Sequence, residues 1–154
     1  MKKSLLLIAC SLIIGVMAGC GKGSGEIDTY QKEITEFFTE MEDYNTKINE
    51  LNPEDSASVE ALFAIFDEME TSYKKLAELK VPEEFSANET LAKQASDYMA
   101  QANQYFHDSF TDTSYNEYTL EAAMECYRRA NKRLGYMVDI LHGKIPDDES
   151  ITVK

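Results

Sequence analysis

Hydrophobic residues recur along most of the chain at alternating intervals of three and four positions. One uninterrupted series runs from Ile27 to Leu51, and a second series with the same spacing covers residues 59–76. A period near 3.5 residues is typical of amphipathic helices that pack along a narrow apolar seam. We therefore predict a helix on either side of Asn52 and Pro53, because proline is well accommodated in the first turn of a helix.

Two further series, in residues 91–105 and 120–141, predict a third and a fourth helix. Residues 86–89 and 114–117 each place a serine three positions before a glutamate, a pattern that caps the first turn of a helix. Gly143 predicts the end of the fourth helix, because glycine readily adopts the left-handed conformation that closes one. The polar stretch between the third and fourth helices is expected to be a loop.

The predicted helices have similar lengths, roughly 24 to 28 residues or about 40 Å, and short connections. Helices of this kind pack as antiparallel neighbours, so the sequence predicts an all-α, up-down-up-down antiparallel four-helix bundle. Alanines in the seams of the third and fourth helices predict that these two helices approach each other closely. A two-helix hairpin that dimerises through the same seams is the structural alternative.

The chain opens with a short basic start and an apolar run from Leu5 to Met17, which together form a secretory signal pattern. This run is shorter than the about 17 residues that a membrane-spanning helix needs. It ends in Met17-Ala18-Gly19-Cys20, where small residues precede a cysteine. With this ending, residues 1–20 resemble a bacterial lipoprotein signal peptide with its lipobox, although Met17 stands where such motifs most often carry leucine.

The resemblance implies cleavage before Cys20, which becomes the first mature residue and carries a thioether-linked diacylglycerol. An ordinary cleaved signal followed by a chance cysteine is the alternative. Because two acyl chains hold a protein stably on a bilayer, we expect an extracytoplasmic domain lipid-anchored to the bacterial cell membrane. The expected organisation is a signal peptide at 1–19, the lipidated cysteine and a flexible tether at 20–25, a four-helix bundle at 26–143 and a C-terminal tail at 144–154.

Length and charge narrow the class of protein. The 154 residues favour a single domain, and 28 acidic against 15 basic residues give a formal net charge of -13. Removal of the signal peptide, which holds two lysines and no acid, makes this charge more negative. Such a balance opposes nucleic-acid binding, which depends on clustered lysine and arginine. It also disfavours lying flat on an anionic membrane.

The residues that carry catalysis or bind cofactors do not form recognisable motifs. His107 and His142 lie near the ends of consecutive antiparallel helices, hence at opposite ends of the bundle, and no haem-attachment motif is present. Asp139 precedes His142 by three positions but lies off the seam, which argues against a ferritin-like di-iron site. Cys126 is the only free thiol of the mature chain, and we expect it to be partly buried and inert. We therefore expect no enzymatic activity, no metal and no cofactor.

Two charged surfaces each have a functional and a structural explanation. Carboxylates off the seam of the first helix are suited to weak binding of divalent cations or a cationic peptide, or simply to solubility. A basic cluster on the fourth helix is suited to an anionic envelope polymer or lipid, or to balancing nearby carboxylates such as Glu125. The acidic residues are Glu33, Glu36, Glu40, Glu42 and Asp43, and the basic ones are Arg128, Arg129, Lys132 and Arg133.

Aromatic residues bracket the connection between the third and fourth helices, at the end expected to lie away from the membrane. The candidate partner-binding residues are Phe106, Phe110, Tyr115 and Tyr118. Exposed aromatic rings with polar tips commonly anchor protein partners, whereas the structural alternative is that they cap the bundle core. The sequence thus predicts a monomeric, non-enzymatic binding module for an unknown protein or envelope partner. The alternative is a small-ligand or cofactor carrier with haem or metal in the core.

Overall fold

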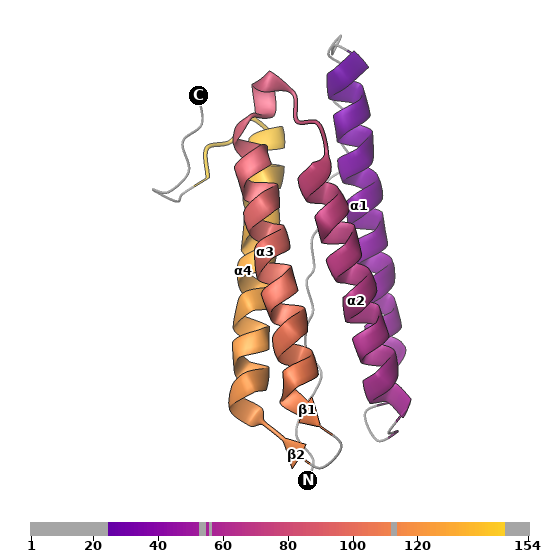
Figure 1. Ribbon diagram of the computed structural model, residues 1–154. Coiled ribbons are helices and arrows are strands. Elements are labelled where there is room, and N and C mark those ends of the chain that lie inside the picture. Colours follow the sequence, from indigo (N-terminus) through magenta and orange to yellow (C-terminus); the bar gives the residue numbers. More distant parts are fainter. Residues whose placement is uncertain (1–24, 53–54, 56, 112–113, 147–154) are drawn as a thin grey trace.

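Four antiparallel helices make up the fold in the computed structural model, which describes residues 25–52, 55, 57–111 and 114–146. The helices are α1 (Gly25–Glu50), α2 (Ala57–Glu78), α3 (Ala87–Ser109) and α4 (Glu117–Leu141). Successive helices run in opposite directions along one axis (Figure 1). The predicted up-down-up-down bundle is confirmed, and one chain supplies all four helices without the dimerisation that the hairpin alternative required.

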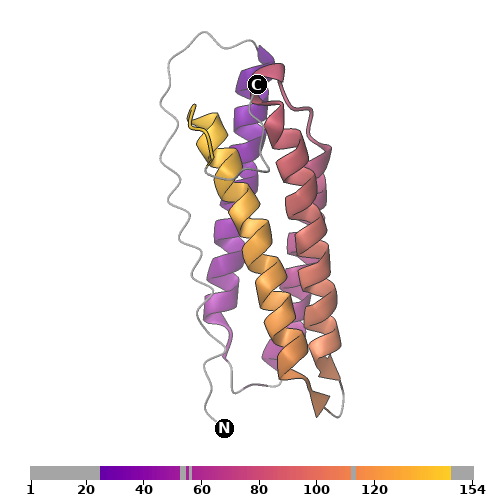
Figure 2. The same cartoon turned by 90° about the vertical axis from the view of Figure 1, so that its left-hand side faces the viewer.

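The bundle consists of two layers of helices. Figure 2 views the molecule from the α3–α4 side, with α1 and α2 in the layer behind. The most extensive interface joins α3 to α4, α2 packs next on α3, and α1 packs mainly on α2. Four fully buried alanines contribute to the core of the α3–α4 layer, and their small side chains permit the close approach that the sequence predicted. They are Ala95, Ala102, Ala123 and Ala130.

Aromatic side chains join the two layers. The ring of Phe66 on α2 is fully buried and stacks on Phe106 of α3, with 4.0 Å between the ring centroids. Phe66 also meets the edge of Tyr127 on α4 at 6.1 Å. The hydroxyl of Tyr73 on α2 donates a hydrogen bond of 2.9 Å to Asn131 Oδ1 on α4, so this buried phenol is satisfied across the bundle.

Short connections close the two ends of the bundle. At the end where α1 begins, the one-turn helix η1 (Glu83–Phe85) joins α2 to α3, and its Phe85 stacks on Tyr30 of α1 with centroids 6.0 Å apart. At the other end, α3 and α4 are joined through a two-residue antiparallel pair, β1 (Phe110–Thr111) and β2 (Ser114–Tyr115), where the sequence predicted only a loop. We call this second end the hairpin end; it comprises the described residues within 40–68 and 98–127 (Figure 1).

The helix ends correct two details of the sequence prediction. The first capping box does not form, because Ser86 has helical dihedral angles and its side chain makes no capping hydrogen bond. The second is displaced, because the N-cap of α4 is Asn116 and not Ser114. Asn116, with extended backbone, caps α4 instead, because its side chain accepts a hydrogen bond of 3.2 Å from the Thr119 amide. The predicted glycine at the end of α4 is confirmed, since Gly143 has a positive φ of 71°.

The predictions for the ends of the chain stay predictions. The signal peptide, Cys20, the tether up to residue 24 and the tail beyond Pro146 lie outside the described residues. Among the described helices, none combines the length and the hydrophobicity needed to cross a bilayer.

The Phe66 stack provides a test of the core. We expect Phe66→Ala to lower the free energy of unfolding by about 3 to 5 kcal/mol, because it leaves a cavity between the two layers. Urea unfolding followed by circular dichroism measures this change. Ala64→Ser on the exposed side of the same helix is the matched control and should change the stability by less than about 0.5 kcal/mol. Equal effects of the two substitutions would contradict the assignment of Phe66 to the core.

Candidate functional site

The four predicted partner-binding residues divide into two pairs in the structure. Phe106 is only 2% exposed and belongs to the core through its stack on Phe66. Phe110 is half-buried, with its ring between Phe63 at 5.6 Å and Tyr115 at 5.3 Å. These two phenylalanines therefore cap the core, as the structural alternative proposed, and do not present their rings fully to a partner.

The two tyrosines of the set are open to solvent. Tyr115 is 52% exposed and Tyr118 is 84% exposed, and both lie at the hairpin end, opposite the beginning of α1 (Figure 1). The β1–β2 pair explains the position of Tyr115. Tyr115 lies opposite Phe110 in the strand pair, and one side of its ring rests on the ring of Phe110. Tyr118 stands in the first turn of α4 beyond this contact. The candidate contact surface is thereby reduced to Tyr115 and Tyr118.

His107 is held by one aromatic and one acidic neighbour from α2. Its imidazole stacks on the ring of Phe63 with centroids 4.5 Å apart, and its Nε2 lies 3.0 Å from Asp67 Oδ1. His142 follows the last turn of α4 at the other end of the bundle, as the sequence predicted. Within the described part of the chain, no three His, Cys, Asp or Glu side chains are grouped closely enough to hold a metal ion.

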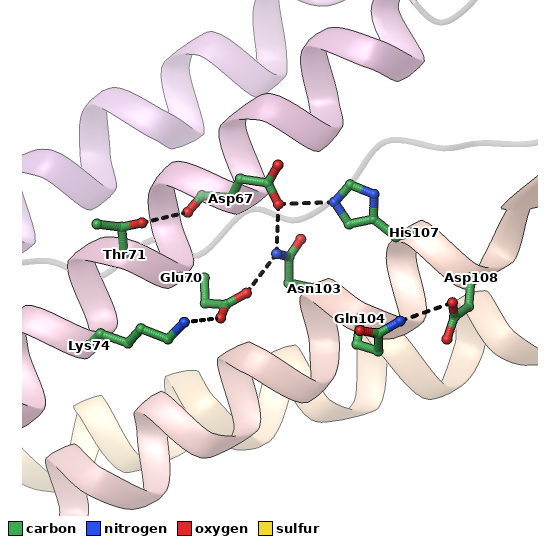
Figure 3. A network of polar contacts seen from close by, with 8 residues as sticks. All are labelled: Asp67, Glu70, Thr71, Lys74, Asn103, Gln104, His107 and Asp108. Atoms are coloured by element: carbon green, nitrogen blue, oxygen red, sulfur yellow. Dashed lines mark hydrogen bonds and ion pairs between the residues drawn. The ribbon is translucent and has the colours of Figure 1, made fainter.

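A polar network that the sequence did not predict surrounds this histidine (Figure 3). Asn103 is buried between α2 and α3, and its Nδ2 donates hydrogen bonds to Asp67 Oδ1 at 2.8 Å and to Glu70 Oε2 at 2.7 Å. Glu70 is also paired with Lys74 one turn along α2. The acids are spaced i, i+3 on α2, and Asn103 and His107 are spaced i, i+4 on α3. The spacing places the two acids on one face of α2, and Asn103 and His107 on one face of α3. It does not show that these two faces meet, because that depends on how the helices pack.

These hydrogen bonds stabilise the charged forms of both acids. The amide of Asn103, followed by the imidazole of His107, holds the pKa of Asp67 below its usual value. Burial by itself raises the pKa of Glu70, but the hydrogen bonds from Lys74 and Asn103 outweigh it, and the pKa is lowered. Both carboxylates are therefore more acidic in the folded protein than in the unfolded chain.

The basic cluster of α4 is engaged with tyrosines and an acid. Arg129 and Arg133 lie over the ring of Tyr98 at 5.8 and 5.7 Å, and Arg133 also lies 5.8 Å from the ring centroid of Tyr136. The predicted i, i+4 pair forms, because Arg129 Nε donates to Glu125 Oε1 at 2.9 Å. Arg128 and Arg129 thus balance Glu125, as the structural explanation proposed, and the cluster in addition covers tyrosine rings of α3 and α4.

The remaining candidates fit the structural explanation as well. Cys126 is 9% exposed, and burial raises the pKa of its thiol, so the nucleophilic thiolate is disfavoured. Of the acids singled out on α1, four are exposed and Glu33 is half-buried. One of them, Glu40, accepts a hydrogen bond of 2.9 Å from the hydroxyl of Ser72 on α2.

No protein-family model, curated protein or solved structure matches this chain. A helical bundle by itself assigns no function, so the surface groups of this bundle are the features that bear on its function.

The acid network predicts how stability depends on pH. Because both pKa values are lower in the folded than in the unfolded state, their stabilisation is present above the unfolded values near about 4. It is lost as the pH falls through the folded values. We expect Asn103→Ala to lower the free energy of unfolding at pH 7 by about 1 to 3 kcal/mol and to flatten its fall below pH 5. Urea unfolding across pH 3 to 7 measures both effects.

A second substitution at position 103 should reverse the direction in which stability changes with pH. Asn103→Asp places a third carboxylate against Asp67 and Glu70, so its stability should decrease as the pH rises from about 4 to 7. Gln101→Ala, on the exposed face of α3, is the control and should keep the pH dependence of the unchanged protein. A pH profile of Asn103→Asp that parallels the control would show that the network has no energetic role.

Proposed function

We propose that this chain is a lipid-anchored, extracytoplasmic and non-enzymatic binding module that contacts its partner through Tyr115 and Tyr118. The observation that carries the proposal is the exposure of two tyrosines at the hairpin end, far from where α1 begins. Tyrosine is enriched in protein interfaces because it offers a large rigid surface with a polar tip and loses little conformational entropy. Tyr115 belongs to the short strand pair and rests on Phe110, and Tyr118 follows in the first turn of α4.

The lipoprotein signal supports the placement of this surface away from the membrane. Cys20 lies five residues before Gly25, the first residue of α1. A lipid on Cys20 therefore brings the start of α1 closest to the bilayer. A helix of 26 residues rises by about 39 Å, so the hairpin end would then stand one helix length further out. A partner in the envelope, outside the lipid, is the kind of molecule that such an arrangement reaches.

The surroundings of the reactive side chains favour binding over catalysis. The imidazole of His107 stacks on Phe63 and its Nε2 pairs with Asp67, and no hydrogen bond described for this imidazole involves a serine, threonine or cysteine nucleophile. The buried Cys126 has a raised pKa. No contact among the described residues favours a haem or metal carrier, since packed aromatic and aliphatic side chains fill the core between the described helices.

The anchor is tested by removing the thiol that carries it. We expect Cys20→Ala to prevent lipid attachment and signal cleavage, so that the mature, diacylated mass disappears from the membrane fraction. Cys10→Ala, in the apolar run of the signal, and Cys126→Ala, in the bundle, are matched controls that should still give the lipidated mass. Mass spectrometry of the intact protein from membranes distinguishes these species. A lipidated product from Cys20→Ala would refute the anchor.

The contact surface is tested in intact cells. We expect Tyr115→Ala combined with Tyr118→Ala to reduce crosslinked-partner recovery at least fivefold and to change the free energy of unfolding by less than about 1 kcal/mol. Ile145→Ala is the control, because Ile145 is also exposed, at 79%, but follows α4 at the opposite end. Full recovery of the partner by the double variant would exclude these tyrosines as the contact.

A further inference from the structure

Charge is distributed unequally along the axis of the bundle. The hairpin end carries twelve carboxylates but one lysine, Lys47, whereas the other described residues carry eleven carboxylates and ten Lys or Arg. Nearly all of the net negative charge of the described residues therefore resides at the hairpin end, where one carboxylate, Glu125, is paired with Arg128 and Arg129 just beyond it. Its carboxylates are Glu40, Glu42, Asp43, Glu50, Asp55, Glu60, Asp67, Glu68, Asp108, Glu117, Glu121 and Glu125.

Two long intervals of the sequence produce this polarity, and only the fold unites them. Neither Lys nor Arg occurs in residues 48–73 or in residues 94–127. The first interval includes the end of α1 and most of α2, and the second includes most of α3 and the start of α4. Up-down connectivity places both intervals at the same end of the molecule (Figure 1). The negative potential of the hairpin end is thus a sum over four helices.

The surface tyrosines supply an independent indication of what this end binds. Tyr44, Tyr98 and Tyr136, which pack along helices, each have a Lys or Arg of the chain within 5.8 Å of the ring centroid. The chain thus places its own cations over Tyr44, Tyr98 and Tyr136. The three exposed tyrosines, which are Tyr105 at 38%, Tyr115 at 52% and Tyr118 at 84%, have no such cation among the described residues, and Tyr115 and Tyr118 are the most open of them.

We propose that the hairpin end binds a polypeptide segment rich in lysine or arginine. The segment's cations would meet the carboxylates of α2 and α4, and one or two of them would lie over the faces of Tyr115 and Tyr118. A cation over a tyrosine face is attracted by the ring, and the surrounding negative potential accelerates its arrival. This inference rests on the proposed function for the location of the contact and adds the chemistry of the partner.

A polypeptide fits this surface better than a single metal ion does. The carboxylates are spread over four helices, and no group of three His, Cys, Asp or Glu in the described chain could share one ion. A segment with several cations at residue spacing can engage separated carboxylates and still place a side chain over each ring. The far end of the bundle, with nearly balanced charge, offers no comparable attraction.

The test measures oligolysine binding to the full-length protein in non-ionic detergent. Fluorescence anisotropy of a labelled oligolysine gives the affinity, and an oligoglutamate of equal length controls for the label. The combined variant Glu60→Gln, Glu117→Gln, Glu121→Gln removes three exposed carboxylates of the hairpin end and should weaken binding about tenfold. The matched variant Glu78→Gln, Glu83→Gln, Glu84→Gln removes three from the other end and should weaken binding less than twofold.

Two substitutions of Tyr118 test the contribution of the aromatic ring to oligolysine binding. Tyr118→Leu should weaken oligolysine binding about threefold, whereas Tyr118→Phe, which keeps the ring, should bind as the unchanged protein does. Equal weakening by the two triple variants, equal binding by the two Tyr118 variants, or no oligolysine binding at low salt would each overturn the proposal. Full recovery of the partner in cells by the Tyr115→Ala, Tyr118→Ala double variant, with end-specific oligolysine binding intact, would instead refute the proposed function alone. A captured partner that crosslinks through a segment without lysine or arginine would refute this inference alone.

Discussion

The close approach of α3 and α4 is the constraint on which the rest of the bundle depends. Fully buried alanines of these helices allow backbones to approach, and the contact of α3 with α4 is the most extensive between any two described helices. The second layer is then held to it through large rings, above all the stack of Phe66 on Phe106. Because α1 packs mainly on α2, its position depends on this chain of contacts.

The buried polar groups between α2 and α3 fix the register of one helix against the other. Hydrophobic side chains of similar size tolerate small shifts of one helix along another, whereas Asn103 reaches both Asp67 and Glu70 in one register only. The same register brings His107 against Phe63 and fixes the last turn of α3. The last turn of α3 continues directly into the strand pair β1–β2. The polar network and the exposed tyrosines are therefore connected through this short segment.

Charge polarity and lipid attachment are compatible with a single orientation. The end of the bundle nearest to Cys20 in sequence has nearly balanced charge and would meet little repulsion from an anionic bilayer. The hairpin end carries the excess of carboxylates, and repulsion by the lipid head groups would keep it outward within about one Debye length, roughly 8 Å at physiological salt. In the proposed orientation, the end with nearly balanced charge would face the membrane and the acidic, aromatic end would face away from it.

Hydrophobic spacing determined the helices, their order and their antiparallel packing, because a 3.5-residue period has one favourable solution when connections are short. The sequence also predicted that α4 ends at Gly143, because the left-handed backbone conformation that closes a helix is open to glycine itself and does not depend on tertiary contacts. The capping boxes were wrong because Ser86 and Ser114 match a local pattern, whereas Asn116 has the extended backbone that a cap needs. Local motifs compete, and the backbone path decides between them.

The tertiary structure alone decided which aromatic residues are exposed and which polar groups meet. Phe106 and Tyr118 lie twelve positions apart and the sequence predicted both as partner-binding residues, but Phe106 fills the core and Tyr118 is open to solvent. The sequence contained Asp67, Glu70 and Asn103 without showing that they touch, because spacing within a helix fixes its face but not its register against a neighbour. For the same reason, two stretches without lysine or arginine become one acidic surface only when the helices are brought together.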